Sequence, residues 1–107
     1  MNIQELKNAD LRRSILTLLA YDVDYQLNQT FISMALEAIG KSVTKDILDN
    51  QLLWLKIQNF VSIDENNNLR IVTLTDQGLE VAKGKARVHG VRDLRPSELS
   101  EIKQFKG

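Results

Sequence analysis

The chain has 107 residues, of which 43% are apolar and 26% charged, a composition typical of one globular domain with a modest core. It has no cysteine and one histidine, which excludes disulfides, thiolate metal sites and histidine-rich metal clusters. No stretch approaches the roughly 18 consecutive apolar residues of a membrane span, and the N-terminus lacks the apolar core of a signal peptide. We therefore expect a cytoplasmic protein that does not enter the membrane.

The net charge is zero, but it is unevenly distributed along the chain. Residues 1–80 carry a net charge of −4 and residues 81–107 a net charge of +4. A neutral protein has no long-range attraction to nucleic acid from its total charge, so any attraction needs a local patch. The candidate patch is the basic stretch of the C-terminal part, which holds Lys83, Lys85, Arg87, His89, Arg92 and Arg95.

The first predicted helix spans residues 9–21. Leu11, Ile15 and Leu18 recur at the spacing i, i+4 and i+7 of an amphipathic helix. The opposite, polar side is expected to carry Arg13, Thr17 and Ala20.

The second and third predicted helices are joined by a short turn. The second helix spans residues 29–39 with Asn28 as its N-cap, and Gly40 follows where the chain must leave the helix. Ser42 is the expected N-cap of a third helix over residues 43–59. A connection of three or four residues containing glycine is typical of a helix-turn-helix motif. The inward faces are expected to hold Phe31, Met34, Ala35, Ala38 and Ile39 on the second helix and Ile47, Leu48, Leu52, Trp54, Leu55 and Ile57 on the third.

The apolar period changes after the third helix. Residues 60–63 alternate in a β-prone pattern, 64–68 form a turn rich in asparagine, and 69–74 return as a second strand. Thr75 is the expected N-cap of a fourth helix that runs from residue 76 to about residue 86. The order predicts a mainly α fold with a small β-hairpin: a winged helix-turn-helix with a three-helix core, a wing, a fourth helix and a C-terminal extension. We divide the chain into this domain, residues 1–86, and a basic extension, residues 87–107, with a short helix over 97–105.

Several motifs resemble those of a narrower group. They are Gly40 and Ser42, Gln51-Leu52-Leu53-Trp54-Leu55 continuing to Asn59-Phe60-Val61, Leu74-Thr75-Asp76-Gln77-Gly78 with Val81-Ala82, His89-Gly90-Val91-Arg92, and Arg95-Pro96. Over residues 10–96 the chain is similar to small winged helix-turn-helix proteins encoded in Mu-like phages and prophages, within the ArsR-like winged-helix superfamily. The resemblance implies this fold and a phage or prophage origin. By position it also implies a DNA-contacting surface on the third helix.

The polar residues at the beginning of the third helix are the surface that such a motif presents to a major groove. They are Ser42, Thr44, Lys45, Asp49 and Asn50. Asparagine can bind adenine and lysine can reach guanine or phosphate, so Lys45 and Asn50 are the expected DNA contacts. Asp46 and Asp49 would repel phosphates, which leaves a purely solvated helix face as the alternative. On the wing the candidate contacts are Asn67 and Arg70, with a plain turn as the alternative.

The basic C-terminal stretch has two interpretations. Lys83, Lys85, Arg87, Arg92 and Arg95 either follow a phosphate backbone or dock on an acidic surface of the same chain or of a partner. Trp54 is expected in the core or at an interface because apolar residues surround it. We also expect a homodimer, with contacts from Leu53, Leu99, Ile102 and Phe105. The alternative is that the short C-terminal helix packs on its own domain.

Two classes of function remain. The residues and the resemblance together predict a phage or prophage DNA-binding protein, with transcriptional regulation as its role, or alternatively a protein-interaction module that does not bind DNA. An enzyme is not expected, since His89 lacks a catalytic partner pattern and no glycine-rich phosphate loop is present. We expect no metal, no cofactor and no small-molecule ligand.

Overall fold

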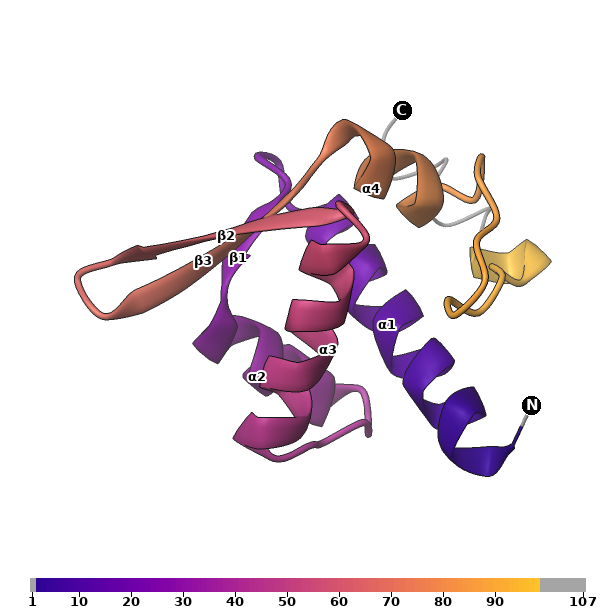
Figure 1. Ribbon diagram of the computed structural model, residues 1–107, viewed down its shortest axis with the longest axis horizontal. Helices are drawn as coiled ribbons and strands as arrows, with labels where there is room; N and C mark the ends of the chain where they lie inside the picture. Colours follow the sequence, from indigo (N-terminus) through magenta and orange to yellow (C-terminus); the bar gives the residue numbers. More distant parts are fainter. Residues whose placement is uncertain (1, 99–107) are drawn as a thin grey trace.

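The computed structural model describes residues 2–98. In this part of the chain the helices α1 (Ile3–Tyr21), α2 (Gln29–Ala38), α3 (Lys45–Ile57) and α4 (Asp76–Ala82) accompany the strands β1 (Gln26–Asn28), β2 (Val61–Asn66) and β3 (Leu69–Leu74). The β2–β3 hairpin projects from one side of the helices, and the segment after α4 lies on the opposite side, beside the first half of α1 (Figure 1). This small mixed α and β globule is compatible with a winged helix.

The sheet has one strand more than the sequence pattern predicted. Its order is β1-β3-β2, and both pairings are antiparallel. The chain enters β1 through Tyr25, whose φ is 58°, and the Leu74 N–H donates to the Tyr25 carbonyl at 2.9 Å. Three residues between two helices are too few to show a strand period, so β1 escaped prediction. By pairing with β3, it anchors the base of the hairpin to the helices.

The hairpin is longer and its turn tighter than predicted. Residues 64–66, expected in the turn, lie in β2, where Asp64 pairs with Ile71. The connection has two residues, Asn67 and Asn68, with φ of 51° and 66°. Two central residues at positive φ are the requirement of a type I′ turn, whose twist matches that of the strands, and asparagine tolerates that conformation.

The helix ends follow their capping residues. The predicted caps Asn28 and Thr75 are confirmed, since their side chains accept from the Phe31 and Gly78 N–H groups. The cap of α3 is Thr44 instead of Ser42, and its hydroxyl accepts from the Ile47 N–H at 3.2 Å. Helix α3 therefore begins and ends two residues inside the predicted range, and the α2–α3 connection is longer than predicted. Helix α4 ends at residue 82, four residues early.

Helix α1 begins six residues before its predicted start. The Asn2 side chain caps it by accepting from the Glu5 N–H at 2.8 Å. The first turns are exposed, so they have no apolar period to reveal them.

The core lies where α1, α2 and α3 meet the base of the sheet. Its fully buried side chains are Ile15, Leu16, Leu19, Ile32, Leu36, Leu48, Leu52, Leu55, Val61, Val72 and Val81. Two predicted apolar faces are wrong in part. On α2, Ile32 and Leu36 face the core, whereas Phe31, Met34 and Ile39 are about half exposed. On α3, Ile47 and Ile57 are exposed. A short helix with apolar residues on two sides offers two possible stripes, and only tertiary packing selects between them.

The polar side assigned to α1 is also wrong. Arg13 and Ala20, expected in solvent, are 2% and 3% exposed. Packing of α4 and the following segment on that side of α1 covers them, and a single-helix pattern does not contain this information.

The hairpin joins α4 through a close backbone contact. The Thr75 N–H donates to the Phe60 carbonyl at 3.1 Å, and the Thr75 hydroxyl donates to the Asn59 carbonyl at 2.7 Å. A Cβ on Gly78 would lie 1.9 Å from the same Phe60 oxygen, so only glycine fits there. The motif from Leu74 to Gly78 is therefore explained by the packing of this junction.

We predict that Leu48→Ala and Leu55→Ala each lower the free energy of unfolding by about 2–5 kcal/mol, because each deletes a fully buried side chain of α3. The exposed Ile57→Ala is the control and should cost at most about 0.5 kcal/mol. Urea unfolding measures all three. A loss below about 1 kcal/mol at both leucines would contradict the packing of α3.

Candidate nucleic-acid interface

The predicted contacts on the third helix occupy different environments. Ser42 is exposed in the α2–α3 connection, and Thr44 uses its side chain to cap α3. Lys45 and Asn50 are exposed, as DNA contacts must be. Asp49 is different, because other side chains surround its carboxylate.

Asp49 is the centre of a cluster that joins three elements. Lys45 Nζ lies 2.8 Å from Asp49 Oδ2, and Arg70 Nη1 lies 3.1 Å from Asp49 Oδ1. The side-chain amide of Gln29, at the start of α2, also donates to Asp49 Oδ1. Hydrogen bonds from Lys45 and then Gln29 hold the pKa of Asp49 below its ordinary value. We call these four residues the Asp49 cluster; it links α2, α3 and the hairpin.

A groove of about 340 Å³ lies beside the Asp49 cluster. Thr30 and Ser33 of α2, Lys45 of α3, and Asn68 and Arg70 of the hairpin are among its lining residues. The structure thus brings Arg70 to Lys45, two residues that the sequence analysis assigned to separate sites. No sequence signal indicated this, since the carboxylate between them was expected to face solvent.

The outward face of α3 carries few charges. Asp46, Asn50, Leu53 and Ile57 follow one another at helical spacing, and all four are exposed. Leu53 and Ile57 are 51% and 71% exposed. This face offers one carboxylate, one amide and two apolar side chains to any partner.

The segment after α4 packs against α1 and does not extend from the body. Val91 is buried in the core cluster, and the Arg92 N–H donates to the Ala9 carbonyl at 3.1 Å. Residues 88–92 therefore pack with the domain that we had ended at residue 86. Docking within the chain, one of the two interpretations of the basic stretch, describes this part of it.

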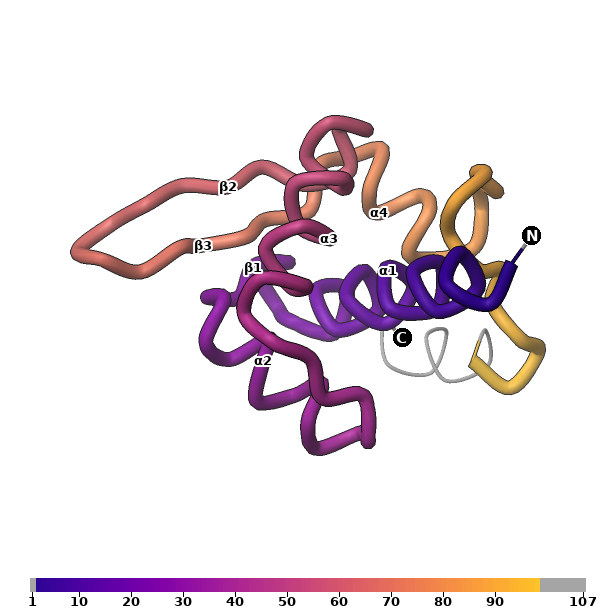
Figure 2. Tube along the Cα trace, turned by 60° about the horizontal axis from the view of Figure 1, so that its bottom comes forward, coloured from indigo at the N-terminus to yellow at the C-terminus, as the bar shows by residue number. Residues whose placement is uncertain are grey.

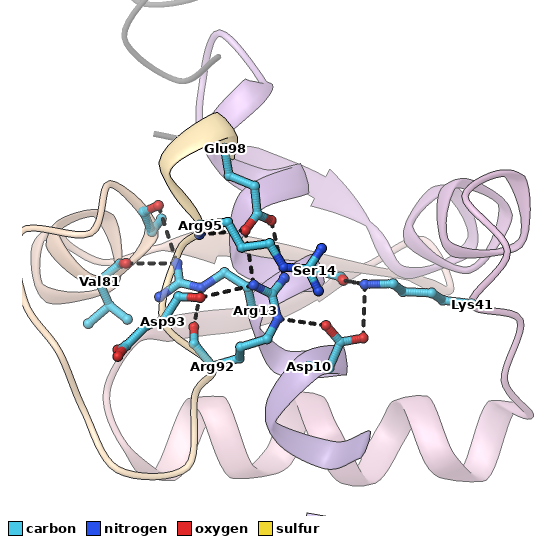
Figure 3. Close-up of polar contacts among 10 residues, drawn as sticks. Asp10, Arg13, Ser14, Lys41, Val81, Arg92, Asp93, Arg95 and Glu98 are labelled. Atoms are coloured by element: carbon cyan, nitrogen blue, oxygen red, sulfur yellow. Dashed lines mark hydrogen bonds and ion pairs between the residues drawn. The ribbon is translucent and has the colours of Figure 1, made fainter. Parts of the chain in front are cut away.

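Arg92 is bound on two sides by carboxylates (Figure 3). Its Nε lies 2.7 Å from Asp10 Oδ1, and its two terminal nitrogens donate to Glu98 at 2.9 and 3.1 Å. Hydrogen bonds from Arg92 lower the pKa of Glu98 to about 2. Although partial burial opposes ionisation of Asp10, hydrogen bonds from Lys41 and Arg92 leave its pKa below the ordinary value. Arg92 is thus engaged inside the chain and is not a free phosphate contact.

Arg13 binds backbone instead of carboxylates. Its guanidinium donates to the carbonyls of Arg92 at 2.6 Å, Val81 at 2.9 Å and Ala82 at 3.3 Å. Figure 3 shows it between α4 and the C-terminal segment. No spacing rule could find this role, because the partners are carbonyls 68 to 79 residues away.

Lys41 connects these contacts to the α2–α3 connection. Its Nζ lies 2.9 Å from Asp10 Oδ2 and donates to the Ser14 hydroxyl at 2.7 Å. We call Asp10, Arg13, Lys41, Arg92 and Glu98 the α1 polar network.

The other predicted basic contacts are more accessible. Arg87 pairs with Asp93 at 3.0 Å, and both side chains are exposed. Lys85 and Arg95 are exposed, and Lys83 is half-buried. The hairpin and residues 87–98 lie at opposite ends of the molecule (Figures 1 and 2), so the basic stretch does not continue the groove beside the Asp49 cluster.

Trp54 is half-buried and packs against the core, as expected. The Arg12 guanidinium lies 3.9 Å from its ring centroid and donates to the Gly90 carbonyl at 3.1 Å. Arg12 also donates to Gln51 Oε1 at 2.7 Å. These contacts fasten α3 to the C-terminal segment.

Over residues 2–98 no group of three potential metal ligands is assembled. No helix of the described chain is long and apolar enough to cross a membrane. The predicted helix over 97–105, with the expected contacts Leu99, Ile102 and Phe105, falls outside the described residues except at its start.

We predict that Glu98→Gln weakens the dependence of stability on acid. The pKa of Glu98 is about 2 in the fold against an ordinary value of 4.5. A lowered carboxylate pKa stabilises the fold above pH 4.5, and this contribution is lost as the pH falls from 4.5 to about 2. Urea unfolding free energies at pH values across this window should therefore fall less steeply in the variant. Glu80→Gln, at an exposed position on α4, is the control, and equal slopes in both variants would contradict the assignment.

Comparison with known proteins supports the expected origin. The chain is 35% identical over 94 residues to the uncharacterized protein gp26 of Escherichia phage Mu, and the match covers 88% of this chain and 97% of that protein. No protein-family model and no solved structure matches the chain. Because the relationship spans nearly the whole length of both proteins, the chain belongs to the same phage protein family as gp26 of phage Mu.

Proposed function

We propose that this phage protein is a winged helix-turn-helix DNA-binding protein that acts as a transcriptional regulator. The element order from α1 to β3 and the sheet order β1-β3-β2 support the winged helix, with the β2–β3 hairpin as the wing. In such a fold the third helix enters the major groove. Its exposed residues Lys45 and Asn50 then face the DNA, and Asn50 can bind an adenine edge.

The Asp49 cluster is the observation that carries this proposal. An acidic residue on a DNA-facing helix argues against binding, since it repels phosphates. Here the carboxylate lies between Lys45 and Arg70, which neutralise it. Arg70 Nε also lies 3.8 Å from Glu65 Oε1, so the four groups together carry no net charge. Asp49 also holds both cations at one groove between helix and wing. We infer that these two cations contact phosphates while α3 contacts bases.

The C-terminal basic residues have a smaller part in this proposal than the sequence suggested. Arg92 is satisfied within the α1 polar network, and the segment lies far from the wing. We therefore assign the main phosphate contacts to Lys45 and Arg70. Lys83, Lys85, Arg87 and Arg95 are left as secondary contacts.

One observation favours the alternative function, a protein-interaction module. Leu53 and Ile57 are large apolar side chains exposed on the outward face of α3. Exposed apolar side chains that adjoin one another are typical of protein-binding surfaces. The alternative predicts that variants of this face lose a protein partner while no DNA is bound.

We predict that Lys45→Ala with Arg70→Ala weakens binding to all DNA sequences alike. The slope of log K against log salt is negative, and its magnitude should decrease by roughly one to two in the variant, because about 0.9 counterion is released per neutralised phosphate. Lys85→Ala with Arg87→Ala removes the same charge from the far end of the molecule and should leave most of the slope intact. Fluorescence anisotropy with DNA fragments from the phage region that encodes this protein, at two or more salt concentrations, measures the DNA affinity of both double variants.

Asn50→Ala tests base contact separately and should change sequence preference more than overall affinity. If no such DNA binds below about 10 μM at low salt, DNA binding is rejected, since non-specific binding alone typically reaches about that strength. The apolar face of α3 would then support the protein-interaction function.

We further propose a homodimer in which Leu53 contacts the second subunit. Leu53→Glu places a charge in this contact and should shift the protein to monomer in sedimentation velocity. Met34→Glu, at a similarly exposed apolar position on α2, is the control and should leave the dimer intact. A native chain that sediments as a monomer at high concentration would reject the dimer.

A further inference from the structure

A groove of about 290 Å³ runs along α1 on the side of the α2–α3 connection. Ser14, Thr17, Leu18 and Tyr21 line it from α1, at the spacing of one helix face. Ile39, Lys41 and Glu98 complete its walls. Leu18, Tyr21 and Ile39 make this a largely apolar surface, and 52% of Ile39 is exposed.

The groove also contains a polar atom whose hydrogen bond is unmet. Thr17 Oγ1 is buried and has no hydrogen-bond partner. Buried hydroxyls nearly always have one, so such an atom requires an explanation.

The described chain ends at this groove with the start of a helix. Residues 96–98 are helical, and Pro96 occupies the first helical position, which favours proline. The Arg95 N–H donates to Glu98 Oε1 at 2.8 Å, which is the backbone contact of a capping box. Glu98 is held by Arg92 and is itself one of the groove residues, so the position of this helix start is fixed.

Nine residues follow Glu98, and their sequence fits the groove. Leu99, Ile102 and Phe105 recur at i, i+3 and i+6, which places them toward one side of a helix. Nine helical residues span about 13 Å, and the seven-residue step from Ser14 to Tyr21 spans about 10 Å. A helix this short needs a surface to pack on, and the groove begins where the helix does.

We propose that residues 99–107 continue the helix begun at Pro96 and dock, within the same chain, in the groove between α1 and the α2–α3 connection. The mode is that of an amphipathic helix in an apolar groove. Three residues that the sequence analysis assigned to a dimer interface, Leu99, Ile102 and Phe105, then cover the chain's own α1. The docked helix also contacts Ile39, at the end of α2. This inference does not depend on DNA binding.

The chain has no cysteine, so an introduced pair tests the docking without background. In the proposed helix, residue 102 would lie about 6 Å along the axis from Glu98, and Thr17 lies about 4.5 Å along α1 from Ser14. A helix that runs along the groove from Ser14 toward Tyr21 would therefore bring residues 17 and 102 side by side. Under mild oxidation, Thr17→Cys with Ile102→Cys should form an intrachain disulfide at least about tenfold faster than Thr17→Cys with Gln104→Cys, whose thiol lies on the opposite helix face.

Non-reducing electrophoresis and peptide mass mapping separate the outcomes. An intrachain bond in the first pair alone supports the proposal. Equal rates in both pairs or no bond in either overturns it, and so does an interchain bond, which would assign the groove to a second copy.

A second measurement covers the case in which the double variants do not fold. In the full chain, Ile102→Asp should accelerate hydrogen exchange of the α1 amides at residues 17–21, whereas Gln104→Asp should not. Equal exchange in the two variants would overturn the proposal.

Discussion

The buried guanidinium of Arg13 is the constraint on which the packing of the end of α4 and of the following segment against α1 depends. It holds the carbonyls of Val81, Ala82 and Arg92 against α1 without a carboxylate partner. Deleting it would leave three carbonyls and a cavity at the junction of three segments, and each buried polar group without a partner costs about 1–3 kcal/mol. Arg13 thereby places the Arg92 side chain between Asp10 and Glu98, which in turn fixes the entrance to the α1 groove.

The sequence correctly predicted those features of the fold that depend on residues close together in the chain. The caps Asn28 and Thr75 and the bounds of β3 follow from residues within a few positions of each other. Periodicity failed for Arg13, because it assigns every charged residue to solvent. The Asp49 cluster was missed for a related reason: Gln29 and Arg70 lie 20 and 21 residues from Asp49, and no spacing rule connects them.

Ion pairing within the fold changes which charged side chains remain available for binding, both beside the hairpin and in the segment after α4. Counted along the sequence, Asp49 weakens a DNA surface and Arg92 strengthens one. In the fold, Lys45 and Arg70 neutralise Asp49, Arg70 is also paired with Glu65, and Arg92 is paired with Asp10 and Glu98. Binding surfaces therefore have to be assigned from the charges that remain after pairing.

The two polar clusters meet at the entrance to α3. Lys41, just before this helix, joins Asp10 of the α1 polar network, and Lys45, its first residue, joins Asp49. The Lys45–Asp49 pair lies within α3, whereas the Arg70–Asp49 pair joins α3 to the hairpin. These pairs are partly exposed, so salt weakens them. If α3 binds DNA as proposed, salt acts twice on that binding: it screens the phosphate contacts, and it weakens the ion pair that joins Arg70 of the hairpin to α3. Part of a measured salt dependence would belong to the protein alone, and the intrinsic stability of the chain at each salt concentration separates the two contributions.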